Sequence, residues 1–183
     1  MSIEQDIAER FGRGDTQAAK LLYETYASWL LGVCLRYVGD RSAAQDLLHD
    51  GFIQILTHIG QFRWQGEGSL KAWLFRVQQN VILMYLRKQE QLGDTLSIDD
   101  IQLSDIPEPE TTRDIPHRVL MQLIAELPPG YRTVFNMYVI DGCSHKEIAQ
   151  LLGIQERTSS SQLLHARRLL AARINAWRKE NLL

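Results

Sequence analysis

A run of basic and small polar side chains near the C-terminus has the chemistry needed to bind nucleic acid. Six basic residues and no acidic residue lie between Arg157 and Lys179. Guanidinium, hydroxyl and amide groups form hydrogen bonds with phosphates and with base edges in a major groove. The candidate DNA-reading side chains on the first turns of this stretch are Arg157, Thr158, Ser160, Ser161 and Gln162.

Two helical patterns joined at a glycine are expected to position these side chains. Ser144 and Glu147 have the spacing of a capping box, which predicts the start of a helix, and Gly153 is placed to end it. A second helix is expected from about Glu156, with an inner face of Leu163, Ala166, Leu169 and Leu170. This arrangement is typical of a DNA-binding helix-turn-helix. The alternative is an amphipathic helix that only packs a helical bundle.

A second candidate surface lies in residues 60–88, where aromatic and basic side chains are interleaved. Aromatic rings can stack on unpaired bases while basic side chains hold the phosphates. The glycines on both sides of Glu67 allow the backbone to approach a nucleotide closely. The alternative is that the aromatic residues form core, and we expect Trp73 and Phe75 to be at least partly buried.

Other residue patterns do not indicate an enzyme. The sequence has no glycine-rich phosphate loop, no H-E-x-x-H and no G-x-S-x-G motif. Asp46 and Asp50 lie four residues apart on one expected helix, but no second acidic helix completes a di-metal site. We interpret them as an exposed face for a partner protein. No catalytic residue, metal ligand or cofactor is predicted.

The composition fits a protein of the cytoplasm. Cys34 and Cys143 have no Cys or His neighbour at metal-ligand spacing, so we expect reduced, largely buried thiols. No apolar run approaches the ~20 residues that a membrane span needs. The N-terminus has no signal-peptide core, and no membrane insertion is expected.

Charge and periodicity divide the 183 residues into three parts. Residues 90–116 carry eight acidic residues and one basic residue, a net charge of −7, whereas residues 117–183 have a net charge of +4. Prolines and glycine interrupt any period in the acidic segment, which predicts a flexible linker. Helical periodicity dominates elsewhere. The predicted fold is all-α, with helical domains at 1–90 and 117–183 joined by a linker at 91–116.

Both halves carry the motifs of one protein family. The C-terminal half reads L-P-x-x-x-R-x-V-F, then G-x-S-x-x-E-I-A-x-x-L-G-I up to Ile154, then T-x-x-S-x-L-x-x-A-R from Thr158. The N-terminal half contains D-L-x-H-D-x-F from Asp46, F-R-W-Q-G-E-G-S-L-K-A-W-L from Phe62 and N-x-x-x-x-Y-L-R-K from Asn80. The chain therefore resembles the extracytoplasmic-function (ECF) sigma factors, the small promoter-specificity subunits of bacterial RNA polymerase.

This resemblance implies functions for the two domains. The first would bind core polymerase and melt and recognise the −10 element, and the second would recognise the −35 element. The implied core-binding residues, on the helix that docks on the β′ clamp, are Asp46, Asp50 and Phe52. The implied −10 DNA-binding residues are Phe62, Arg63, Trp64, Gly66, Ser69, Lys71, Arg76, Asn80, Arg87 and Lys88. The implied −35 DNA-binding residues are Lys146, Arg157, Thr158, Ser160, Ser161, Gln162, Arg167 and Arg168.

The implied partners are core RNA polymerase, through its β′ clamp and β flap, and promoter DNA as duplex and single strand. An anti-sigma factor is a further candidate partner. The sequence departs from the family pattern at several positions. Gln45 and His49 stand where Glu and Gln are usual, Met84 replaces a usual Asp, and many members have Arg at the positions of Ser160 and Gln162. An operator-binding regulator with a sensing or dimerising N-terminal domain is the alternative function.

Overall fold

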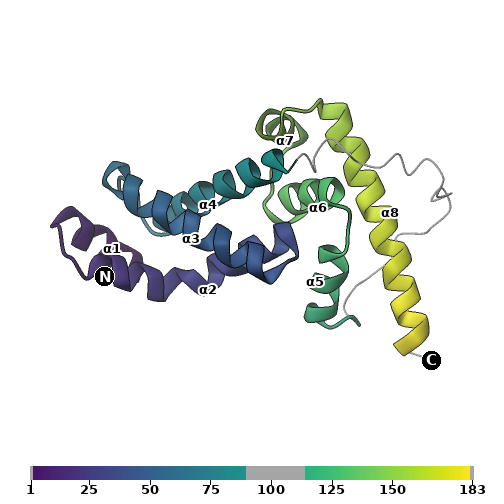
Figure 1. The fold of residues 1–183 in the computed structure, drawn as a ribbon, viewed down its shortest axis with the longest axis horizontal. Helices are drawn as coiled ribbons and strands as arrows, with labels where there is room; N and C mark the ends of the chain where they lie inside the picture. Colours follow the sequence, from purple (N-terminus) through teal and green to yellow (C-terminus); the bar gives the residue numbers. More distant parts are fainter. Residues whose placement is uncertain (1, 90–113, 182–183) are drawn as a thin grey trace. The chain divides into compact units, whose positions relative to one another are not determined.

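Two compact helical units make up the part of the chain that the structure describes. The computed structural model describes residues 2–89 and 114–181 (Figure 1). The two units are Met1–Tyr85 and Leu86–Leu183, and their boundary falls near the end of α4. The described residues contain helices and no strand, which confirms the predicted all-α fold. The predicted acidic linker, apart from residues 114–116, lies outside the described residues.

The first unit packs its helices around an aliphatic core. Its elements are α1 (Ile3–Gly12), α2 (Ala18–Val38), α3 (Arg41–His58), the 3-10 turn η1 (Ile59–Gln61) and α4 (Ser69–Lys88). Helix α2 packs along α3, and α1 packs on α2 and on η1. The core forms because apolar side chains recur at helical spacing on the facing sides. Its fully buried members include Leu22, Leu30, Ile55, Leu74 and Ile82.

Local signals fix the helix ends in this unit, with one correction. Gly39 ends α2 at φ +72°, and the Asp40 carboxylate caps α3 by accepting a first-turn N–H at 2.8 Å. From the sequence alone, Asp15 is expected to cap α2, because it directly precedes the helical pattern, and this prediction is wrong. Its carboxylate accepts the N–H of Gln17 only two residues on, as in an Asx turn, and the helix begins at Ala18.

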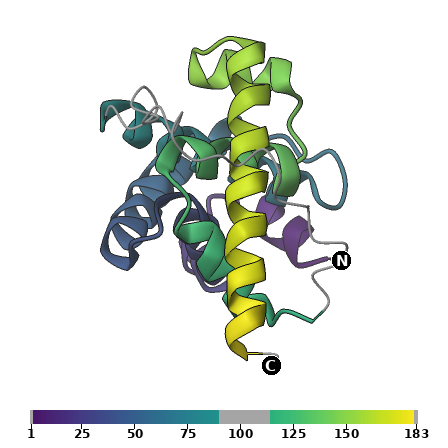
Figure 2. The ribbon, with the colours of Figure 1, turned by 90° about the vertical axis from the view of Figure 1, so that its right-hand side faces the viewer.

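The second unit is organised around one long helix. Its elements are α5 (His117–Ala125), α6 (Pro129–Phe135), the π-helical turn η2 (Asn136–Ile140), α7 (His145–Leu152) and α8 (Glu156–Asn181). Helices α5, α6 and α7 all pack against α8, which is continuous from end to end (Figure 2). Buried apolar residues from each helix fill the space between them, including Ile124, Val134, Ile148, Ala166 and Ile174.

Candidate nucleic-acid interface

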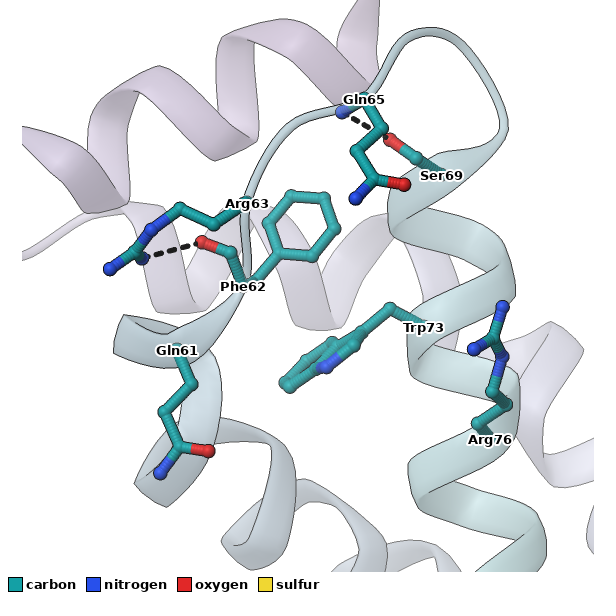
Figure 3. A pocket seen from close by; sticks show the side chains of 7 residues that line it. All are labelled: Gln61, Phe62, Arg63, Gln65, Ser69, Trp73 and Arg76. Carbon is teal, nitrogen blue, oxygen red and sulfur yellow. Dashed lines mark hydrogen bonds between the residues drawn. The ribbon is translucent and has the colours of Figure 1, made fainter.

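A pocket of about 280 Å³ opens where the chain passes from η1 through a loop into α4 (Figure 3). Phe62 and Trp73 form its aromatic walls, with ring centroids 5.7 Å apart. An aromatic surface beside amides and guanidinium groups can hold an unstacked base and contact neighbouring phosphates. The polar side chains of the lining are Gln61, Arg63, Gln65, Ser69 and Arg76.

Local hydrogen bonds shape the loop that closes the pocket. Arg63 folds back so that its Nη1 donates to the C=O of Gly60 at 2.8 Å. Ser69 precedes an apolar helical run and is expected from the sequence to be the N-cap of α4, but in the structure it is the first residue of that helix. Its hydroxyl donates to the C=O of Gly66 and accepts the N–H of Gln65 at 3.3 Å. The loop therefore holds a defined shape next to the aromatic pair.

Four of the residues predicted for −10 DNA line the pocket: Phe62, Arg63, Ser69 and Arg76. Lys71 instead lies over the ring of Trp29, with Nζ 4.9 Å from the ring centroid. The other predicted residues lie outside the pocket lining, and most are exposed: Trp64, Gly66, Asn80, Arg87 and Lys88.

The sequence prediction missed three lining residues, Gln61, Gln65 and Trp73. The spacing of α4 could have identified one of them. Trp73 lies four residues after Ser69 and three before Arg76, so the three residues share one face of the helix. Trp73 and Phe75 are half-buried, as expected, and Trp73 belongs to the pocket wall as well as to the packing of the unit.

A buried acidic residue lies behind the loop. Glu4 of α1 is 8% exposed, and its Oε2 accepts the N–H of Gly68 at 2.8 Å. Desolvation, the nearby Glu4 charge and a hydrogen bond to Glu4 raise the pKa of Tyr26 to about 12. The Glu4 carboxylate therefore lies close to Tyr26 of α2 as well as to the loop.

The helix α3 presents an acidic and apolar face. Asp46 and Asp50 are exposed, one helical turn apart. Ile53 is 48% exposed and continues the same face, because it follows Asp46 at i+7. Phe52, predicted as a polymerase-binding residue, is 6% exposed and packs against Tyr23 with ring centroids 4.8 Å apart. Direct contact through Phe52 is therefore corrected to a packing role, because its position on α3 points toward α2.

The second unit contains the predicted helix-turn-helix. Ser144 and Glu147 form both bonds of the capping box at the start of α7, and Gly153 ends this helix at φ +71°. Bonds from the Ser144 backbone N–H and hydroxyl hold the pKa of Glu147 below its usual value. These local contacts fix where α7 begins and where the turn to α8 occurs.

A polar pair joins the two helices of this motif. Ser159 of α8 is fully buried, and its Oγ lies 2.9 Å from Nδ1 of His145 in α7. The His145 ring also stacks on Tyr138, with centroids 4.5 Å apart. The buried hydroxyl thus has a hydrogen-bonding partner, and this contact joins α8 to α7.

The outer face of α8 carries most of the residues predicted for −35 DNA. Arg157, Thr158, Ser160, Ser161 and Arg167 are exposed, Arg168 is half-buried, and Lys146 is exposed on α7. Leu164, which sequence reasoning missed, is 45% exposed on the same face.

Gln162 is the exception and corrects a prediction. It is 6% exposed and belongs to the buried stripe of α8, together with Ser159, Leu163 and Ala166. Positions 159, 162, 163 and 166 fall on one side of a helix, and that side packs against the rest of the unit. Gln162 is therefore not an exposed base-reading side chain in this structure.

Basic residues on the last turns of α8 make contacts within the unit. Arg178 forms a two-pronged ion pair with Asp114, with both N–O distances 2.7 Å. Arg173 donates to the C=O of Leu123 at 3.3 Å and lies 3.8 Å from Glu126. The acid-free basic run is therefore not one uniformly free surface, because Arg173 and Arg178 join α8 to Leu123 and Glu126 and to Asp114.

Comparison with known proteins identifies two family models in the chain. Residues 22–91 match the model "Sigma-70 region 2", and residues 117–170 match "Sigma-70, region 4". The first match contains the pocket and the exposed face of α3, and the second contains the helix-turn-helix.

Individual relatives extend over most of the chain. The RNA polymerase sigma-H factor of Pseudomonas aeruginosa is 30% identical over 175 residues, which cover 90% of each chain. The ECF RNA polymerase sigma-E factor of Haemophilus influenzae is 26% identical and covers 93% of this chain and 95% of its own. A solved structure of CnrH in complex with the cytosolic domain of CnrY has a TM-score of 0.49 at 20% identity, covering 96% of this chain and 99% of its own. No helix among the described residues combines the length and apolar character of a membrane span.

Proposed function

The chain belongs to the ECF sigma factors of RNA polymerase, and we propose that it reads a promoter with the two surfaces described above. A sigma factor of this kind directs core polymerase to specific promoters and takes part in starting transcription. One observation carries the proposal: each matched region contains a surface with nucleic-acid chemistry, the pocket in the first unit and the cationic outer face of α8 in the second.

The pocket would receive a base of the −10 element after it leaves the stack. Phe62 and Trp73 offer a stacking surface, which contributes about 1–3 kcal/mol per base in comparable sites. Gln61 and Gln65 can donate to and accept from the Watson–Crick edge of that base. Arg63 and Arg76 would contact the flanking phosphates. Extracting a base costs a few kcal/mol, so such contacts must offset that cost before melting can proceed.

The outer face of α8 would read the −35 duplex. Arg157, Thr158, Ser160 and Ser161 are placed to reach base edges, with Arg157 able to bind guanine through two hydrogen bonds. Lys146, Arg167 and Arg168 would contact phosphates and set the register of the helix in the groove. Leu164 is an apolar group on this face and suits contact with a thymine methyl group.

The polymerase-binding surface would be the exposed face of α3. Asp46 and Asp50 supply negative charge, and Ile53 and Leu56 supply exposed apolar area beside it. Such a face fits a basic, partly apolar partner surface, and we assign it to the β′ clamp of core polymerase. The second unit would contact the β flap. An anti-sigma factor is a candidate partner only through the family resemblance.

The chain would itself perform no chemical step, because nucleotide addition belongs to the polymerase that it directs. It would work in the cytoplasm, where the polymerase is. The match of residues 22–91 to sigma-70 region 2 favours this function over the alternative of an operator-binding regulator, in which the N-terminal half would sense a ligand or dimerise.

Binding and transcription with core polymerase test this proposal. The full chain should pull down core enzyme at micromolar concentration and support run-off transcription from a cognate promoter. On a promoter with a pre-melted −10 bubble, Gln65→Ala should weaken binding while the unfolding midpoint stays unchanged. No association with core enzyme would contradict the polymerase-binding role, and an unchanged bubble affinity for Gln65→Ala would contradict the pocket assignment.

A further inference from the structure

A buried carboxylate connects three distant segments of the first unit. Glu4, in the first turn of α1, is the only buried acidic side chain in the described residues 2–89 and 114–181. Its Oε2 accepts the N–H of Gly68 in the pocket loop at 2.8 Å. Tyr26, on α2, lies near enough to the same carboxylate for the Glu4 charge to raise the pKa of its hydroxyl. One side chain therefore links α1, α2 and the loop.

The chemistry of this side chain suits the donors around it. A carboxylate is an acceptor only, so it can satisfy the Gly68 N–H and the Tyr26 hydroxyl together. Burying a charged group is costly unless it is hydrogen-bonded, and an apolar side chain of similar length would fill the same space without that cost. What the carboxylate adds over such a side chain is the hydrogen bond to the loop.

The bond to Gly68 has no equivalent elsewhere in the loop. Among the hydrogen bonds of the described residues, it is the only one that joins residues 62–68 to a helix other than the flanking η1 and α4. The remaining loop bonds stay within residues 59–72. Gly68 stands at φ +85° directly before Ser69, which lines the pocket. Helix α1 also packs on η1, at the other end of the loop.

We propose that Glu4 is a positioning residue for the pocket, whose carboxylate fixes the loop tip in the shape that receives a −10 base. This inference rests on the proposed function of the pocket. A loop that is held in its binding shape before DNA arrives loses less conformational freedom on binding. If the bond is lost, only a fraction of the molecules present the competent loop, and the apparent affinity falls by that fraction.

Two substitutions at Glu4 separate positioning from packing. Glu4→Met keeps the length and fills the space but has no strong acceptor for the Gly68 N–H. Glu4→Gln retains an amide oxygen that can accept from Gly68. Glu9→Gln removes one negative charge from the same helix without touching the loop, so it controls for the general effect of charge on DNA affinity.

The measurement uses the full chain bound to core polymerase. Affinity for a pre-melted −10 bubble is compared with affinity for a −35 duplex and with the urea midpoint of the free chain. We expect Glu4→Met to weaken bubble binding about ten-fold, which corresponds to the loss of one charge-assisted hydrogen bond. Glu4→Met should keep the −35 duplex affinity and the urea midpoint of the wild-type chain. Glu4→Gln should keep most of the bubble affinity. Glu9→Gln should leave the ratio of bubble affinity to −35 duplex affinity unchanged.

The other outcomes distinguish failure of this inference from failure of the proposed function. If Gln65→Ala weakens bubble binding and Glu4→Met does not, the pocket keeps its function and the role of Glu4 is overturned. If Glu4→Met lowers the midpoint and both DNA affinities together, Glu4 is a packing residue and the inference is overturned. Equal losses for Glu4→Met and Glu4→Gln would overturn it too, because the acceptor would not matter. If neither Gln65→Ala nor Glu4→Met affects the bubble, the proposed pocket fails and the inference with it.

Discussion

Replacing Gly51 with alanine should destabilise the first unit because α3 and α4 approach too closely there for a side chain. A Cβ built on Gly51 would lie 1.8 Å from Oε1 and 2.5 Å from Cδ of Gln78. Gln78 is fully buried, and its Nε2 donates to the C=O of Leu47 at 2.8 Å. The carboxamide therefore cannot move away without giving up a buried hydrogen bond.

The magnitude follows from opposing effects. Alanine in place of glycine inside a helix stabilises by about 1 kcal/mol. Overpacking a buried site costs about 1–3 kcal/mol, and a buried amide that loses its partner costs about 1–3 kcal/mol more. We expect a net loss of about 2 kcal/mol. Gly32→Ala is the matched control, since Gly32 lies inside α2, is exposed and has nothing within 4 Å of an added Cβ. It should gain about 1 kcal/mol.

Urea unfolding followed by tryptophan fluorescence measures this difference. Three of the four tryptophans, Trp29, Trp64 and Trp73, belong to the first unit, so the signal reports mainly on it. The two alanine variants should differ by about 3 kcal/mol in the free energy of unfolding. Adding Gln78→Ala to Gly51→Ala should cost less than the two single losses combined, because the clash disappears. Equal stability of Gly51→Ala and Gly32→Ala would refute the close approach.

Three further predictions concern the second unit and the thiols. Arg157→Ala should weaken −35 binding by about 1–3 kcal/mol and relax base preference at one position, whereas Gln162→Ala should lower stability and leave base preference unchanged, as measured with single-base substitutions in the duplex. The hydrogen bonds from Arg178 hold the pKa of Asp114 below its usual value. Their contribution to stability is present above the unfolded carboxyl pKa and is lost as pH falls through the folded value, so Asp114→Asn should flatten the acid limb of the stability profile. Burial raises the pKa of the Cys34 thiol to about 12, so alkylation at neutral pH should leave Cys34 unmodified until the chain unfolds, by mass spectrometry.

Each of these predictions has an outcome that contradicts it. A shift in base preference for Gln162→Ala would place its side chain on the DNA face. An unchanged acid limb for Asp114→Asn would mean that the ion pair does not form in solution. Modification of Cys34 at the same rate as the partly exposed Cys143 would show that the core around α2 opens readily.

Features set by neighbouring residues were predictable from the sequence. The capping box spans the four residues from Ser144 to Glu147, and the helix ends at Gly39 and Gly153 each depend on one glycine in the left-handed conformation. Such signals work within a single turn of helix, where the backbone alone fixes which atoms meet. The all-α fold and the helix-turn-helix follow from these signals together with helical periodicity. The cap assigned to Asp15 failed because an aspartate can serve an Asx turn as readily as a helix start.

Contacts between residues far apart in sequence decided which side chains are exposed and which are buried or paired within the protein. The basic run of α8 looked uniform, yet Arg178 pairs with Asp114, 64 residues away, while Arg157 faces outward. Gln162 and Ser159 are polar, but α7 and α6 pack against the side of α8 that carries them. Glu4 reaches a loop 64 residues away. A helical period shows that two faces exist, but only the packing of neighbouring helices determines which face loses its water, because burial depends on elements that the period does not contain.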